Sequence, residues 1–115
     1  MHCGSQSDLS CRCTQDPQEY TVALGTKLVF RYSISHNVWL MPSQEAFEAC
    51  DFSSGARELA SATQGGVAAA DVDRLGYANV FEILASTTDT LYFACQVSDH
   101  CQKGQKIAVV VEPGV

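Results

Sequence analysis

The sequence lacks an apolar run long enough to cross a bilayer, which takes roughly 20 residues in a helix, so we expect no membrane span. It also lacks a secretory signal peptide at its start, and Met1 is then an engineered or a mature beginning. Basic residues are scarce, because 7 Lys and Arg face 13 Asp and Glu for a net charge of -6. This balance favours cationic or neutral partners and argues against nucleic acid or an anionic membrane surface.

Cysteine, by contrast, is abundant, with six residues in a chain of 115. A short chain this rich in cysteine is typical of an oxidising compartment. We therefore expect a secreted or cell-surface protein whose signal peptide is absent from this sequence. The length is that of one domain and is sufficient for a hydrophobic core.

The residues with the most distinctive chemistry lie between Cys95 and Lys106. Cys95 ends an apolar stretch typical of a strand, His100 follows five residues later, and Gln105 five residues after that. A second imidazole is available at His36. Two imidazoles, one thiolate and a weak axial donor suit copper in both of its common oxidation states. The sequence therefore predicts one copper ion with the ligands His36, Cys95, His100 and Gln105.

Around these ligands the sequence resembles the phytocyanins, a branch of the blue-copper cupredoxins. The resemblance covers residues 19 to 112, and its pieces are Gly25–Tyr32, His36–Val38, Ala46–Asp51, Tyr92–Cys95, His100–Cys101 and Gly104–Lys106. Glutamine at the axial position, where other branches carry methionine, makes the stellacyanin-like subgroup the nearest match. The family's first strand, which bears Gly and Trp, is not recognisable in residues 1–18.

The resemblance implies a disulfide between Cys50 and Cys101. That bridge would close a loop of about 50 residues, which is worth roughly 3–4 kcal/mol in the chain-entropy model. The remaining cysteines give either one pair with one free thiol or an intermolecular bridge. These remaining cysteines, apart from the metal ligand, are Cys3, Cys11 and Cys13.

Three residues next to the ligands are expected to shape the metal site without binding the ion. Asn37 is either a turn residue or a tie between the two ligand loops, and the resemblance implies the tie. Val38 and Phe93 are apolar neighbours of ligands and suit dry surroundings for the metal. Such outer residues orient ligands and tune the ion.

The pattern of apolar residues predicts the fold. From Glu19 onward several stretches alternate with a period of two, as strands with one buried face do. Short strands, frequent turns and little helix predict an all-β, Greek-key β-sandwich of the cupredoxin type with one or two short helices. We divide the chain into a Cys-containing N-terminal arm, residues 1–18, and a copper-binding domain, residues 19–115.

Three local expectations can be tested against the structure. In the stretch 27–34, the residues expected to face the core are Leu28, Phe30, Tyr32 and Ile34. Ser43 is expected to cap a short helix, which would deliver Cys50 toward its partner. The region 51–77 is the least regular, and its Ala-rich pieces 56–62 and 67–75 are candidates for helical turns.

Other metal assignments remain open at this point. Met41 is a thioether near His36 and could replace Gln105 as axial donor, although a methionine there is more typical of core packing. His2 with Cys11 and Cys13 could form a second site in the arm, although disulfides are the more common use of such cysteines. Zinc also accepts Cys and His ligands, and we interpret it as mismetallation.

The leading functional hypothesis is a type 1 copper protein that carries single electrons, with His100 as its exposed ligand. Three histidines are too few for a coupled oxygen-reducing copper cluster, so we predict no enzyme. The alternative is an extracellular copper-binding or interaction module in which redox activity is incidental. We expect a redox partner protein or a small reductant, and a monomer, with a disulfide-linked dimer through an N-terminal cysteine as the alternative.

Overall fold

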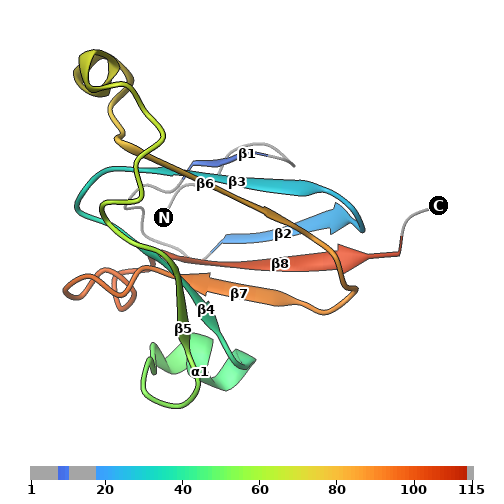
Figure 1. The fold of residues 1–115 in the computed structure, drawn as a ribbon. Helices are drawn as coiled ribbons and strands as arrows, with labels where there is room; N and C mark the ends of the chain where they lie inside the picture. Colours follow the sequence, from blue (N-terminus) through green and yellow to red (C-terminus); the bar gives the residue numbers. More distant parts are fainter. Residues whose placement is uncertain (1–7, 11–17, 114–115) are drawn as a thin grey trace.

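The computed structural model describes residues 8–10 and 18–113, which form two β-sheets packed face to face (Figure 1). In order across the smaller sheet lie β1 (Asp8–Ser10), β3 (Lys27–Tyr32) and β6 (Asn79–Leu84). In order across the larger sheet lie β2 (Gln18–Ala23), β8 (Lys106–Glu112), β7 (Leu91–Ala94), β4 (Val38–Met41) and β5 (Arg57–Ala60). The predicted all-β sandwich is confirmed.

The chain crosses repeatedly between the two sheets. β1 and β2 are neighbours in sequence but lie in different sheets, where they pair in parallel with β3 and β8. The other strand pairs, β3 with β6 and the run β8–β7–β4–β5, are antiparallel. Strands β1 and β2 thus begin inside the segment predicted as an arm, and the division at residue 18 stays a prediction.

The main core fills the space between the sheets. Leu28, Phe30 and Tyr32 of β3 point inward, as their alternation predicts, and pack against residues of the larger sheet. The ring of Phe30 meets that of Phe93 edge-on, with 4.9 Å between centroids. Each such buried side chain contributes about 1.5–3 kcal/mol through the apolar area it removes from water.

The expectation for Ile34 is wrong. Its side chain is 71% exposed, because β3 ends at Tyr32 and residues 34–35 form a turn. Alternation determines the facing of side chains only while the backbone stays extended. The same turn means that His36 is placed by its loop rather than by the phase of the strand.

The first helix, α1 (Gln44–Ala49), forms as expected. The Ser43 Oγ accepts a hydrogen bond from the backbone N–H of Ala46 at 3.1 Å, and this N-cap bond fixes the start of the helix. Cys50 ends the helix in the left-handed conformation, with φ at 52°. α1 packs on the outer side of the larger sheet, in a second core cluster that includes Met41, Phe47 and both disulfide cysteines.

The region 51–77 is partly different from expectation. Residues 57–60 form the edge strand β5 rather than a helical turn, because pairing with β4 overrides the helix preference of alanine. The second Ala-rich piece does become helical, as the 3-10 turn Ala69–Asp71 followed by α2 (Val72–Leu75). Over the described residues, no helix has the length and apolar character needed to cross a membrane.

Candidate metal centre

Three of the four predicted ligands converge at one end of the sandwich. His36 lies on the loop of residues 33–37 after β3, here called the His36 loop, and Cys95 follows the last residue of β7. His100 lies between β7 and β8, on the segment 95–105, here called the Cys95 loop. The Cys95 Sγ is 3.7 Å from the His36 Nδ1 and 3.5 Å from the His100 Nδ1. All three donor atoms lie within 4.8 Å of one another.

These separations fit a shared metal ion. A first-row divalent ion takes imidazole nitrogen at about 2.0 Å and thiolate sulfur at about 2.3 Å. With angles of about 110–120° at the ion, those bonds put sulfur and nitrogen roughly 3.5–3.7 Å apart. The donor set of one thiolate and two imidazoles is also the set that suits copper.

The Cys95 thiol is held in a dry position. Its side chain is 1% exposed, on the inward face of the strand that it follows. The backbone N–H of Cys95 donates to the carbonyl of Gln105 at 3.0 Å, and the N–H of Gln105 donates to the carbonyl of His100 at 2.9 Å. These two bonds close the Cys95 loop on itself. Gly104, with φ at 98°, makes the turn that closure requires.

Gln105 is fully buried and lies beside His36. Burial, and then the nearby His100, lowers the pKa of His36 below its ordinary value, while a hydrogen bond with the Gln105 side chain opposes the shift. A lowered pKa keeps the imidazole neutral, which is the form that binds metal. The structure therefore places Gln105 next to one of the clustered donors, on the loop that carries the other two.

Asn37 joins the two loops. Its Oδ1 accepts a hydrogen bond from the backbone N–H of Gln96 at 2.8 Å, and its Nδ2 donates to Glu58 at 3.4 Å. Val38 and Phe93 are buried in the main core. Asn37 thus connects the two loops, whereas a role of Val38 and Phe93 in the metal centre stays a prediction.

Asn79 was not expected to contribute. It is 1% exposed at the start of β6, and its Oδ1 accepts from the N–H of Gly65 at 2.7 Å. Its Nδ2 lies within 2.9–3.3 Å of three carbonyl oxygens, those of Tyr32, Ser33 and Ala62. The Ser33 carbonyl also accepts from the His36 N–H at 3.2 Å. The signal available in the sequence was a lone amide at the start of an apolar strand.

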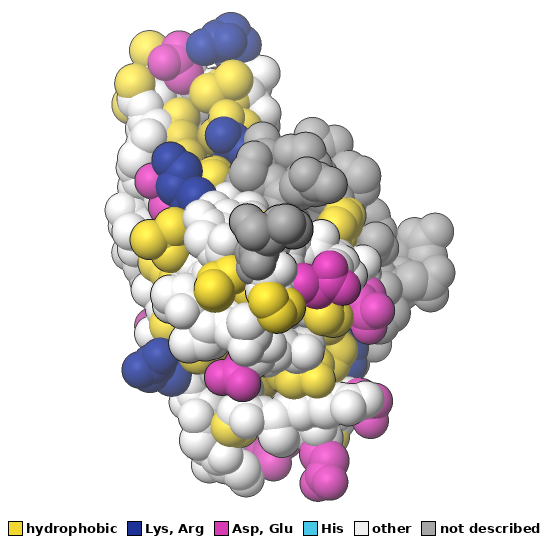
Figure 2. Space-filling view, turned by 90° about the vertical axis from the view of Figure 1, so that its right-hand side faces the viewer, with side chains coloured by type: hydrophobic (Ala, Val, Ile, Leu, Met, Phe, Trp, Pro, Cys, Tyr) yellow, Lys and Arg dark blue, Asp and Glu magenta, His cyan; other side chains and the backbone are white. Residues whose placement is uncertain are grey.

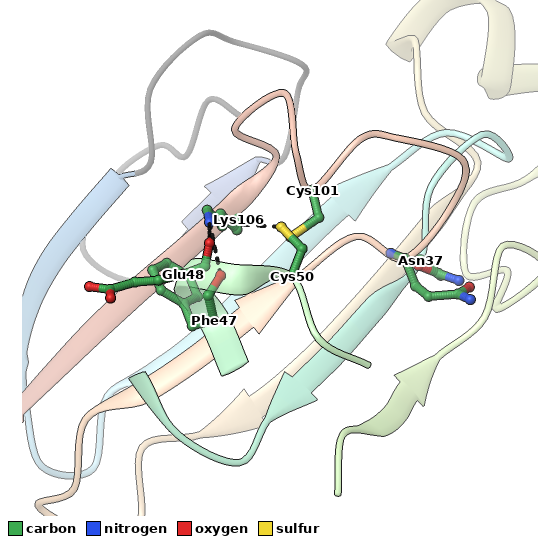
Figure 3. The surroundings of a disulfide bond; sticks show 7 residues. Asn37, Phe47, Glu48, Cys50, Cys101 and Lys106 are labelled. Carbon is green, nitrogen blue, oxygen red and sulfur yellow. Dashed lines mark hydrogen bonds between the residues drawn. A yellow bond between two sulfur atoms is a disulfide. The ribbon is translucent and has the colours of Figure 1, made fainter. Parts of the chain in front are cut away.

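The predicted disulfide between Cys50 and Cys101 is confirmed, with 5.9 Å between the two Cα atoms. It ties α1 to the Cys95 loop at the residue after His100 (Figure 3). Next to it lies the largely buried Lys106, another residue to which the sequence analysis gave no role. Burial lowers the pKa of Lys106, and the charge of Glu48 opposes this shift.

The other assignments have simple outcomes. Met41 is buried in the second core cluster, as a packing residue would be. Both His36 and His100 are half-buried, so exposure does not single out His100. Cys3, Cys11, Cys13 and His2 lie outside the described residues.

The end of the molecule away from the Cys95 loop has a different character. Figure 2 views that end, where apolar, acidic and basic side chains are mixed and no histidine is visible. The clustered imidazoles are thus confined to one end of the described chain.

Comparison with known proteins gives one family and several similar folds. A family model described as a plastocyanin-like domain matches residues 10–105. Cucumber stellacyanin with Cu²⁺ is 23% identical, with a TM-score of 0.61 over 83% of this chain and 73% of that chain. Cucumber basic protein, a blue copper protein, is 25% identical, with a TM-score of 0.56 over 85% and 81%. Spinach plantacyanin is 22% identical, with a TM-score of 0.59 over 90% and 97%. No curated protein matches.

Proposed function

The chain belongs to the plastocyanin-like family, and from this membership we propose that it is a type 1 copper protein that carries single electrons. The observation that carries the proposal is the approach of the Cys95 thiol to two imidazole nitrogens at 3.5 and 3.7 Å. The similarity in fold to a blue copper protein supports it. It also agrees with the phytocyanin resemblance of the sequence.

We assign the copper ligands to His36, Cys95, His100 and, in the axial position, Gln105. Bound copper would supply a couple between two oxidation states that differ by one electron. The chain's part is to offer donors that both states accept, namely imidazole nitrogen and thiolate sulfur. Their positions are fixed by strand ends and by the hydrogen bonds of the Cys95 loop. Ligand atoms in fixed positions would move little when the ion gains or loses an electron, and this keeps the barrier to electron transfer small.

The surroundings protect the thiol. Because Cys95 is buried, water and oxidants reach its sulfur with difficulty, and a thiolate exposed to them would be oxidised. Asn37 holds the two ligand loops together through Gln96. We propose that Asn37, Val38 and Phe93 together keep the donors in place and dry.

We further propose that the protein acts as a carrier and not as an enzyme, in an oxidising compartment outside the cytosol. The disulfide between Cys50 and Cys101 supports that location. The partner would be a redox protein or a small reductant. We also propose that residues 1–18 form an N-terminal arm, that residues 19–115 form the copper-binding domain, and that the protein is a monomer.

The test is a visible and electron-paramagnetic-resonance spectrum after addition of Cu(II) to the purified protein. We expect an intense blue sulfur-to-copper band with narrow copper hyperfine splitting. Cys95→Ser should abolish the band. Gln96→Ala, which changes an exposed neighbour and keeps the backbone N–H, should retain it. A colourless wild-type protein, or a coloured Cys95→Ser variant, would overturn the assignment.

A further inference from the structure

Lys106 is a buried lysine that directly follows the assigned ligand Gln105 without being a ligand itself. Lys106 is 8% exposed, although it is a lysine, a residue type almost never fully buried unless it has partners. Its Nζ donates to the carbonyl of Phe47 at 2.8 Å and to that of Glu48 at 3.2 Å (Figure 3). It also lies 3.8 Å from the Cys50 Sγ and 4.9 Å from the centre of the Phe47 ring.

These contacts have a physical reason. The last carbonyls of a helix lack the usual partner four residues on, and α1 ends at Ala49, where the Phe47 carbonyl accepts a long bond of 3.4 Å from the N–H of the C-cap residue Cys50. An ammonium group that leaves water needs acceptors of this kind to offset its desolvation. The cation and the helix end therefore satisfy each other, and the aromatic face of Phe47 adds a further attraction. These contacts, here called the clamp, connect Lys106 to the end of α1, where Cys50 is the C-cap residue.

Lys106 is also joined to the metal centre by the strands. It follows Gln105 directly, and across the sheet it is paired with Ala94, the residue before Cys95. Cys50, which Lys106 contacts, is bonded to the residue after His100. A shift of Lys106 would therefore be transmitted to three of the four assigned ligands.

We propose that Lys106 is a positioning residue of the copper centre that clamps α1 and its disulfide against the Cys95 loop, and that its positive charge favours the reduced state of the site. This rests on the proposed function in its second half. A fixed positive charge inside the protein opposes the additional positive charge of the oxidised ion. The first half concerns the metal-free chain and stands independently.

The experiment compares two substitutions of Lys106 with one matched control. Lys106→Met removes both the donor and the charge, and Lys106→Gln removes the charge but keeps a donor. The control is Lys103→Met on the same loop, whose lysine is mostly exposed and pairs with Asp99 at 3.3 Å. A charge in that position is screened by solvent.

The first readout is the rate at which a small dithiol reduces the disulfide of the metal-free protein. In that reaction the dithiol is oxidised to its own disulfide, and Cys50 and Cys101 become thiols. Both cysteines are buried, so reduction needs local opening. We expect Lys106→Met, which loses both hydrogen bonds to α1, to react roughly fivefold or more faster than wild type, because the loss of even one such bond has an effect of that size. Lys106→Gln and Lys103→Met should react at rates close to wild type.

The second readout is the reduction potential of the copper-loaded proteins. We expect both Lys106 variants to lie below wild type and Lys103→Met to lie close to it. A Lys106→Met rate no faster than that of Lys103→Met would overturn the clamp, and unchanged potentials would overturn the charge effect. If Lys106→Met does not fold, the potential of Lys106→Gln still tests the charge effect. Lys106→Ala then tests the clamp, and a dithiol rate equal to that of wild type would overturn it. A failure of wild type to form a blue site would count against the proposed function alone.

Discussion

The two loops that carry the histidines are held in place by different means. The His36 loop is tied by neutral hydrogen bonds: the buried amide of Asn79 donates to Ser33, and Asn37 accepts from the N–H of Gln96. The Cys95 loop is tied by a covalent bridge at Cys101 and by the buried cation of Lys106. A neutral network fails one bond at a time, whereas a disulfide holds until it is chemically broken. We therefore expect substitutions that affect the two loops to lower the free energy of unfolding by different amounts.

The largest effect is expected on the covalent side. Replacing both Cys50 and Cys101 with alanine removes a bridge between residues 51 apart, which should cost about 4 kcal/mol of unfolding free energy. Urea unfolding of the metal-free protein measures this loss. Gln102→Ala, an exposed change next to Cys101, is the control. A loss below about 1 kcal/mol would show that the bridge adds little to the Cys95 loop.

The next effect is expected on the neutral side. Asn79→Ala removes the contacts of a buried amide with four backbone groups and leaves the Gly65 N–H and the Ala62 carbonyl without this partner, for a cost of about 3 kcal/mol. Asn37→Ala loses two bonds in a half-buried place and should cost about 1 kcal/mol. Urea unfolding compares the two variants. Equal losses would contradict the view that Asn79 is the main anchor of the His36 loop.

A third change should alter the potential with a smaller effect on stability. Gln105→Met replaces a hard oxygen donor by a soft sulfur, which favours reduced copper, so the reduction potential should rise. The two side chains are similar in volume, and the loss of the Gln105 hydrogen bond with His36 should lower the stability by about 1 kcal/mol. Voltammetry of the copper-loaded variant measures the shift, with Gln96→Met as an exposed control. A potential that stays constant or falls would remove Gln105 from the ligand set.

The smallest effect concerns a carboxylate next to the disulfide. Hydrogen bonds from the side chain and backbone of Ser53, and from Ser54, lower the pKa of Asp51. A lowered pKa in the folded state means that ionisation stabilises the fold above the unfolded pKa of about 3.9, and that this stability is lost as pH falls through the folded pKa. Asp51→Asn should therefore be less stable than wild type at pH 7. The difference should shrink in acid; a constant difference in urea unfolding would contradict this.

The sequence predicted the donors better than it predicted what holds them. The spacing of Cys95, His100 and Gln105 is local, so it is visible in a single stretch of chain. The bonds of Asn79 reach residues 14 to 47 positions away, and the clamp of Lys106 reaches 58 and 59 positions away. Contacts over such separations exist only once the fold is formed. A polar residue in an apolar strand is the one trace that they leave in the sequence.

Periodicity predicted the fold where strands are regular and failed where they end. Leu28, Phe30 and Tyr32 follow the alternation into the core, and Ile34 does not because the backbone turns. The strand Arg57–Ala60 was missed because its composition favours helix, while its pairing with β4 is a property of the whole sheet. The helix α1 was predicted correctly because its N-cap residue, Ser43, directly precedes it in the sequence.

The parallel pairing of β2 with β8 has a consequence for how the protein is made. Gln18 pairs with Ile107, so a strand from early in the chain waits for one that is synthesised much later. Closing so long a loop is entropically costly, and such topologies fold slowly. β8 is also the strand that begins just after Gln105. Because the four assigned donors span residues 36 to 105, synthesis must pass Gln105 before they can meet, and it must pass β8 before β2 can pair.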